Sequence, residues 1–165
     1  MKKLFLALLL AGIATSSQAG LNQVPGPVYG DQTGTAAVTG FLGEHGTLTG
    51  SSTGLTSATY ADLITQSLNP GVWNVQCSIF FAPAGTTTVS ALIAGVNSVA
   101  NTDPNTPQTT TQLQATFTVG GGQYISSPPV LVNVTTATVY RCGGQANFGV
   151  STLNAIGTIT WTRVK

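Results

Sequence analysis

Charged side chains are the scarcest feature of this 165-residue chain. Lys, Arg, Asp and Glu make up 5% of its residues, against roughly 25% in an average soluble domain. Proteins that follow a nucleic-acid backbone need clustered basic side chains to neutralise phosphates, and this chain has five Lys and Arg in all. Its composition therefore argues against nucleic acid as a partner. It favours self-association, because low net charge promotes it, and leaves a monomeric secreted domain as the alternative.

Residues that perform catalysis are also few. The chain has one histidine, His45, and four carboxylates, Asp31, Glu44, Asp62 and Asp103. His45 beside Glu44 in a glycine-flanked turn has the chemistry of a general base, but neighbours on a turn rarely aim at one substrate atom, so a solvated pair is expected. Asp62 and Asp103 facing each other across a cleft, as in a glycosidase, are the weaker alternative.

The usual motifs of catalysis and cofactor binding are missing as well. The sequence has no Gly-x-Ser-x-Gly elbow and no metal-ligand spacing. The run 120–122 of three glycines does not open a helix, so it is not a phosphate loop. We expect a protein that is not an enzyme and that needs no cofactor or metal.

Residues 1–19 have the three parts of a secretory signal peptide. Lys2 and Lys3 give a basic start, residues 4–14 are an apolar run too short for a membrane span, and Ser17 and Ala19 frame a cleavage site. Removing them leaves three basic and four acidic residues, a net charge of 3 − 4 = −1. We expect an exported protein with no membrane span after processing.

The two cysteines, Cys77 and Cys142, lie on predicted strands far apart in the chain. In an exported protein an even number of cysteines suggests a disulfide. Two small buried residues that never meet are an equally good interpretation.

Alternating apolar and polar residues predict strands through most of the mature chain. The clearest run follows the Asn-Pro-Gly turn at 69–71 and places five residues on one side until Phe80 breaks the pattern: Trp73, Val75, Cys77, Ile79 and Phe81. We predict this to be the central strand of the fold. Residues 57–68 are interpreted as a strand pairing with it, with a one-turn helix as the alternative.

Further strands are expected near 35–39, 47–49, 86–96, 112–119, 130–134, 138–148 and 153–165, with a bulge at 143–144. About eight strands without a helix after the leader predict an all-β fold, an antiparallel β-sandwich of jelly-roll type over residues 35–165. Residues 20–34, rich in Pro and Gly, are expected to form an extended N-terminal arm.

Two features point to surface contacts. Residues 97–111 form a long loop without hydrophobic period, and its Asp103 and Asn105 are the candidate contact residues; a connector without a role is the alternative. Sugar-binding sandwiches use exposed aromatics as stacking platforms. The two tryptophans are in phase with apolar neighbours and are expected in the core, which leaves four freer candidates: Tyr29, Tyr60, Tyr124 and Tyr140.

Three segments resemble small structural proteins of tailed bacteriophages and prophages. Residues 68–75 are similar to a Leu-x-x-Gly-x-Trp-x-Val strand, 138–148 to a Thr-Val-Tyr-Leu-x-x-x-x-x-Phe strand, and 156–165 to a Gly-x-Ile-x-Ala-Arg-Arg-Val ending. The resemblance spans residues 57–165. It implies a jelly-roll head like those of tail fibres, decoration proteins and the trimeric tumour-necrosis-factor-like group, with no catalytic residues. The leader and the cysteines depart from this pattern.

These observations lead to one expectation and one alternative. We expect an exported, non-enzymatic structural or surface-binding protein, associated with a phage or prophage virion as a decoration protein or fibre-like head. It is expected to form a homo-oligomer, taken as a trimer, and to contact a virion protein or a cell-surface glycan. The alternative is a monomeric secreted carbohydrate-binding or adhesin domain of a bacterium.

Overall fold

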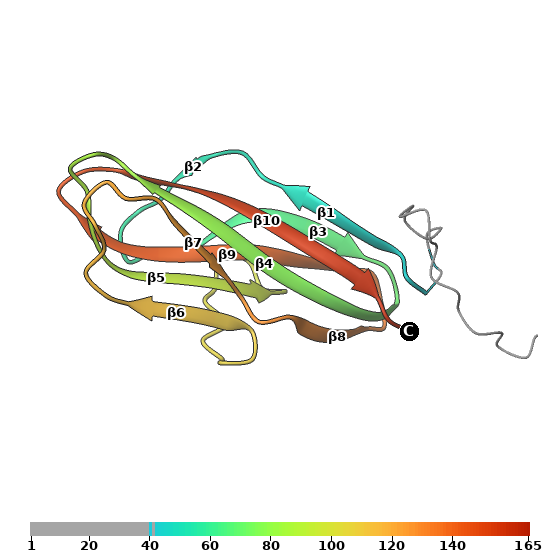
Figure 1. The fold of residues 1–165 in the computed structure, drawn as a ribbon. Helices are drawn as coiled ribbons and strands as arrows, with labels where there is room; N and C mark the ends of the chain where they lie inside the picture. Colours follow the sequence, from blue (N-terminus) through green and yellow to red (C-terminus); the bar gives the residue numbers. More distant parts are fainter. Residues whose placement is uncertain (1–39, 41) are drawn as a thin grey trace, which may run out of the picture. The chain divides into compact units, whose positions relative to one another are not determined.

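Ten β-strands and no helix make up the part of the protein that the computed structural model describes, which is Gly40 and residues 42–165 (Figure 1). The strands are β1 (His45–Thr49), β2 (Thr53–Gly54), β3 (Ala61–Leu68), β4 (Gly71–Pro83), β5 (Thr88–Asn97), β6 (Thr110–Gln114), β7 (Gln123–Ser126), β8 (Val130–Val134), β9 (Thr138–Gly149) and β10 (Leu153–Arg163). The expected signal peptide, the N-terminal arm and the strand near 35–39 lie outside the described residues.

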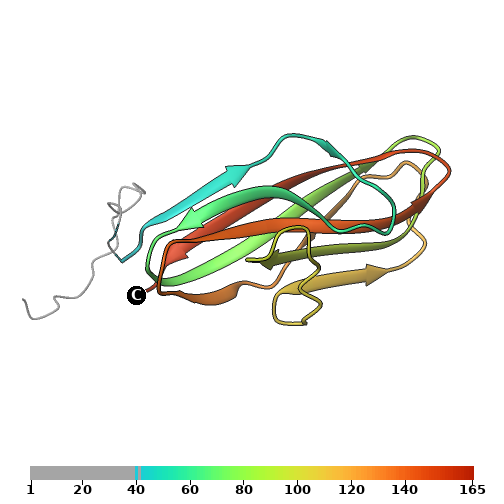
Figure 2. The same ribbon diagram turned by 180° about the vertical axis from the view of Figure 1, so that it is seen from behind.

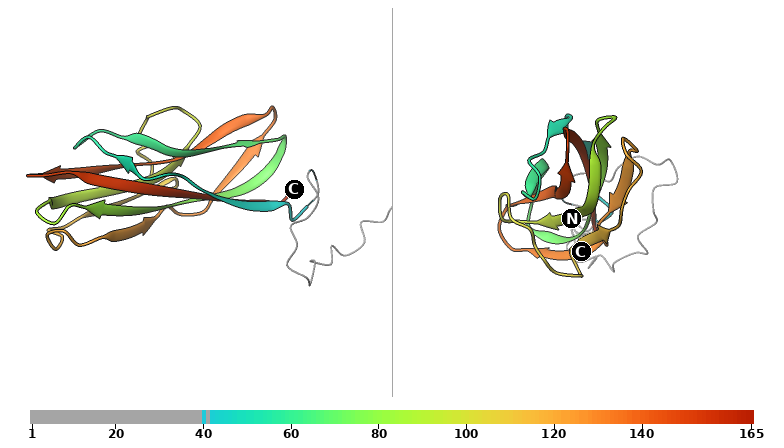
Figure 3. Two further views of the ribbon diagram at one scale, coloured as in Figure 1. Left: turned by 90° about the horizontal axis from the view of Figure 1, so that it is seen from above. Right: turned by 90° about the vertical axis from the view of Figure 1, so that its left-hand side faces the viewer.

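Two antiparallel sheets pack face to face, with their long strands running in nearly the same direction (Figures 1 and 3). One sheet has the order β1-β10-β4-β7, with β2 also on β10 and β8 also on β4; the other has the order β3-β9-β5-β6. Figure 2 shows the second sheet from its own side. The predicted all-β antiparallel sandwich is confirmed.

The difference between ten strands and the expected eight has a simple origin. The edge of β4 is covered by two short strands in succession, β8 on Gly71–Val75 and β7 on Ser78–Phe81. Pro128 and Pro129 interrupt them, because proline has no N–H for the ladder. Counting β7 and β8 as one interrupted strand and setting aside the two-residue β2 leaves eight, four in each sheet, in the double-sheet arrangement of a jelly roll.

Strand β4 is central, as its alternation predicts. It pairs with β10 on one side and with β7 and β8 on the other. The inward side chains are at most 1% exposed: Trp73, Val75, Cys77, Ile79 and Phe81. Leu92 and Ala146 of the opposite sheet are 0% exposed and belong to the same core. Burial of these faces is the main favourable term that holds the sheets together.

The predicted pairing of residues 57–68 with β4 is wrong. This segment does form a strand, β3, but β3 pairs with β9 in the other sheet. The Asn-Pro-Gly turn is therefore a corner between sheets, with Gly71 at a φ of 151° and the Trp73 indole N–H donating to the Asn69 carbonyl at 2.9 Å. Leu68, 1% exposed, enters the core from the opposite layer.

Two other local predictions need correction. The bulge expected at 143–144 lies on the partner strand, where the register slips between Asp62 and Ile64. The strand expected over 112–119 stops at Gln114, opposite Ala91, where the pairing of β5 with β9 slips in register. The chain beyond Gln114 stays beside β5 through two isolated backbone hydrogen bonds, of 3.2 Å each.

Candidate functional site

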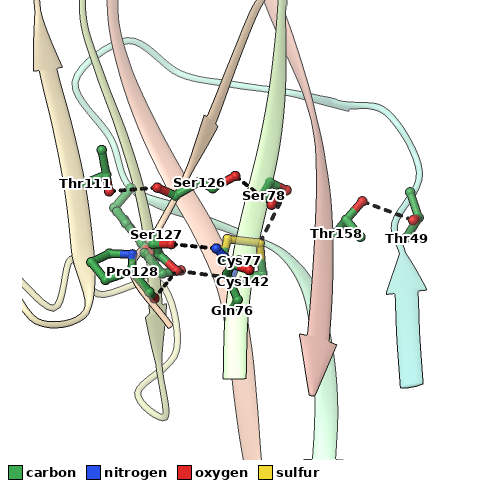
Figure 4. The surroundings of a disulfide bond; sticks show 12 residues. Thr49, Gln76, Cys77, Ser78, Thr111, Ser126, Ser127, Pro128, Cys142 and Thr158 are labelled. Carbon is green, nitrogen blue, oxygen red and sulfur yellow. Dashed lines mark hydrogen bonds between the residues drawn. A yellow bond between two sulfur atoms is a disulfide. The ribbon is translucent and has the colours of Figure 1, made fainter. Parts of the chain in front are cut away.

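A disulfide joins the two sheets at the centre of the sandwich (Figure 4). Cys77 lies on β4 and Cys142 on β9, 65 residues apart in the chain. Both residues are 0% exposed. The bond therefore lies out of reach of solvent and ties together strands from opposite layers.

Arg163, the last residue of β10, makes contacts within the fold, and one of them is with Glu44. The Arg163 guanidinium lies 3.4 Å from the Glu44 carboxylate, donates to the Pro70 carbonyl at 2.7 Å and stacks 4.7 Å over the Trp73 ring. His45 takes a different partner, with its Nδ1 3.0 Å from the Gly43 carbonyl oxygen. Glu44 and His45 thus do not share a hydrogen bond that would activate the imidazole.

Asp62 is held by a second arginine. Arg141 Nε lies 3.0 Å from Asp62 Oδ2, and the same guanidinium donates to the Ser98 carbonyl at 2.8 Å. The arginine therefore connects β3 and β9 to the start of the loop of residues 98–109. Asp103 lies in that loop, and both carboxylates act on the same neighbour, Tyr60.

Tyr60 is a buried phenol beneath this loop. Its hydroxyl donates to the Gly95 carbonyl at 3.3 Å. Burial, and then the negative charges of Asp103 and Asp62, raise the pKa of Tyr60 well above its ordinary 10.0, while a hydrogen bond with Asn97 acts in the opposite direction. The phenol is therefore neutral over the whole physiological range.

The loop of residues 98–109 lies tightly on the sheet. A Cβ on Gly95 of β5 would meet Pro104 Cγ at 3.0 Å, so the glycine permits this close approach. Further anchors are the Asn97 amide donating to the Thr102 carbonyl and the Asp62 N–H donating to Asn101 Oδ1 at 3.1 Å. The loop is thus fixed to β3 and β5 by side chains at its base.

Asp103 and Asn105, the predicted contact residues, lie in the middle of this loop, on either side of Pro104. Asp103 is half-buried and accepts the Asn105 N–H at 2.9 Å, while Asn105 is exposed with a φ of 45°. Both line a hollow of ≈ 320 Å³ together with Thr106, Pro107 and two residues of β6. A second hollow, of ≈ 330 Å³, lies on the other side of the loop, toward Val130 and Tyr140. The pair therefore lies in a concave, accessible position.

The outward face of the six-stranded sheet is a surface that the sequence did not single out. Side chains alternate along a strand, so the residues opposite the core point outward in rows across the sheet. Four hydroxyl residues form one such row across β1, β10, β4 and β7 and bond to each other in pairs: Thr49 with Thr158 at 3.0 Å and Ser78 with Ser126 at 2.7 Å (Figure 4). The adjacent row contains Phe80 and Tyr124. We call this surface the outer face.

Within Gly40 and residues 42–165, no three His, Cys, Asp or Glu side chains lie together in a way that would hold a metal ion. Over the same residues there is also no helix long and apolar enough to cross a membrane.

No family model and no curated protein matches this chain. Similar solved structures come from infectious bursal disease virus. The VP2 subviral particle is 13% identical, with a TM-score of 0.43, and the match covers 73% of this chain and 32% of that one. The structure of the Gx strain is 12% identical, with a TM-score of 0.42, and the match covers 73% of this chain and 32% of that one. The structure of the Gt strain is 11% identical, with a TM-score of 0.36, and the match covers 74% of this chain and 38% of that one.

This chain therefore spans about a third of the length of those chains. Identities and TM-scores this low carry no functional argument. These structures also do not test the resemblance to tailed-phage proteins, which stays a prediction.

Proposed function

We propose that this protein is an exported, non-enzymatic β-sandwich that assembles with copies of itself and serves as a structural or surface-binding component, associated with a virion. The observation that supports this most directly is the combination of a buried disulfide with a content of charged residues of 5%. Each part supports a different half of the proposal.

Export is supported by the Cys77–Cys142 bond. Structural disulfides persist in oxidising compartments and are rare in the reducing cytosol. With both residues 0% exposed, the bond has no access to a substrate thiol, which favours a structural over a redox role. An oxidising destination agrees with the signal peptide expected in residues 1–19.

Assembly is supported by the fate of the charges. In the described part of the chain, Glu44 and Asp62 are each held by an arginine. Charged side chains at a surface normally keep proteins apart, and their depletion favours contacts between copies. We expect a trimer, on the resemblance of residues 57–165 to the trimeric jelly-roll group.

A binding role is supported by the loop of residues 98–109. It is held to the strands by the Arg141 and Asn101 side chains, and its Asp103 and Asn105 line one of the two hollows beside it. A loop fixed in this way presents Asp103 and Asn105 without a large loss of conformational entropy on binding.

Solution mass tests the assembly. The full chain is expressed for export and the purified product is measured by light scattering after gel filtration at micromolar concentration, in low and in high salt. We expect a mass near three chains in both, because contacts between uncharged surfaces are not screened by salt. A single-chain mass under both conditions contradicts the proposal.

A further inference from the structure

We infer that the outer face is a binding site for a neutral glycan, with a sugar ring stacked on Tyr124. This inference concerns a different surface from the loop of residues 98–109 and does not depend on the proposed self-assembly. Three properties of the outer face support it: an aromatic platform, hydroxyl groups beside that platform, and outward strand residues without charge.

The platform is an exposed aromatic pair. Tyr124 of β7 is 78% exposed, and its ring lies 4.4 Å from that of Phe80, with an angle of 29° between the planes. Phe80 is directly opposite Tyr124 in the ladder, and Ile156 of β10 is directly opposite Phe80. One face of the tyrosine is thus held by Phe80 while much of the ring stays in water, which orders the platform before a ligand arrives.

Hydroxyl groups lie beside the platform. A shallow hollow of ≈ 160 Å³ is lined by Thr49, Ser78, Phe80, Tyr124, Ile156 and Thr158. Its one serine and two threonines belong to the two hydrogen-bonded pairs described above. A hydroxyl both donates and accepts, so it matches the hydroxyl groups of a sugar in either direction. Apolar surface with a few polar groups at its border is the usual form of a small-ligand site.

The ligand must be neutral because the outer face is. The outward residues of β1, β4, β7, β8 and β10 include no Lys, Arg, Asp or Glu, and their polar members are Thr, Ser, Asn, Gln and His45 at the far end of β1. Sialylated or sulfated glycans require cationic partners, which Arg and Lys supply. A neutral pyranose has an apolar C–H face for the aromatic ring and hydroxyl groups for the border.

The same features argue against a second copy of this chain as the occupant. Within the hollow the apolar part is one row, Ile156, Phe80 and Tyr124, and the row of serines and threonines lies beside it. A stable interface between proteins buries about 800 Å² on each partner, with a more apolar core. A single stacked tyrosine with hydroxyls around a hollow of ≈ 160 Å³ fits one sugar ring better than a protein surface.

The test is binding of the exported full-length protein to an array of neutral and anionic glycans, followed by titration calorimetry with the best neutral oligosaccharide. We expect neutral glycans to bind and anionic ones not to. Tyr124→Ala should weaken binding at least tenfold, Tyr124→Phe should preserve it, and Ser78→Ala should weaken it by a smaller factor.

Leu131→Ala is the matched control, since Leu131 is 70% exposed on the same face but outside the hollow, and should leave the affinity unchanged. Thermal unfolding of each variant checks the fold. Binding to no neutral glycan, a preference for anionic glycans or an affinity unchanged by Tyr124→Ala would each overturn the inference. Light scattering on Tyr124→Ala separates it from the proposed function: the mass should stay that of the parent, and a change of mass without glycan binding would make this face an interface between copies.

Discussion

Removing the disulfide between Cys77 and Cys142 should destabilise the protein by about 4 kcal/mol. In the chain-entropy model, a cross-link that closes a loop of 65 residues limits the unfolded chain by about this amount. The free energy of unfolding of a native protein is roughly 5–15 kcal/mol, so the cross-link supplies a large fraction of the total stability. The corresponding fall in melting temperature is on the order of 15 °C.

The assay compares three forms of the exported protein by urea unfolding: oxidised, reduced, and the double variant Cys77→Ala, Cys142→Ala. The reduced form keeps both sulfur atoms in the core, so its loss of stability isolates the cross-link. The double variant adds the cost of the space left by two sulfurs, and it should be the least stable of the three. The slopes of free energy against urea concentration report whether the unfolded states differ in compactness.

Reduction itself gives a second readout. Because both cysteines are 0% exposed, a reductant should reach the bond only when the sandwich opens. Reduction should therefore be slow in buffer and speed up as urea approaches the unfolding midpoint. The stabilising role of the bond would be contradicted if the oxidised and reduced forms had free energies of unfolding within about 1 kcal/mol of each other. Rapid reduction of the native protein would contradict its burial.

Three further predictions concern packing and the loop of residues 98–109. Gly144→Ala should cost about 2 kcal/mol or more in urea unfolding, because its Cβ would lie 2.6 Å from a buried isoleucine side chain, whereas Gly85→Ala, with nothing within 4 Å, should stay within about 1 kcal/mol of the parent. Folding raises the pKa of Tyr60 above 10.0, so the folded state holds the phenol proton more tightly than the unfolded state does. The stability that this contributes is present below pH 10.0 and is lost as the pH rises above it. Tyr60→Phe should remove that part of the decline in the free energy of unfolding between about pH 8 and 11. Arg141→Met should speed amide hydrogen exchange in 98–109 by about tenfold or more, and unchanged exchange there would contradict the anchoring role.

The strands that carry a long alternation were predictable. In β4 five inward positions repeat without interruption, and all are buried. Val130, Val132 and Val134 likewise define β8 over the range that the structure shows. In both cases the pattern depends only on the local backbone, because period-two alternation places one set of side chains on the core.

The partner of each strand was not predictable from the same pattern. Residues 57–68 precede a Pro-Gly turn and then β4, which looks like a hairpin in sequence. A corner that crosses between sheets uses the same turn residues, and the choice depends on whether Leu68 packs from the same layer as Trp73 or from the opposite one. That is a property of the assembled core.

The outer face was missed for a related reason. Strand β7 has four residues after a run of glycines, too few to show a period, so Tyr124 could not be assigned to a face. One signal did exist in β4, where Phe80 breaks the alternation by adding an aromatic to the polar side. Its partner across the ladder is set by the register, and the sequence does not specify that register.

Native mass spectrometry of the exported protein would show processing, the cross-link and assembly in one spectrum. We expect a complex of three chains, each lacking residues 1–19 and each two hydrogens lighter than the reduced chain. A single chain that retains its first nineteen residues and carries two free thiols would contradict it.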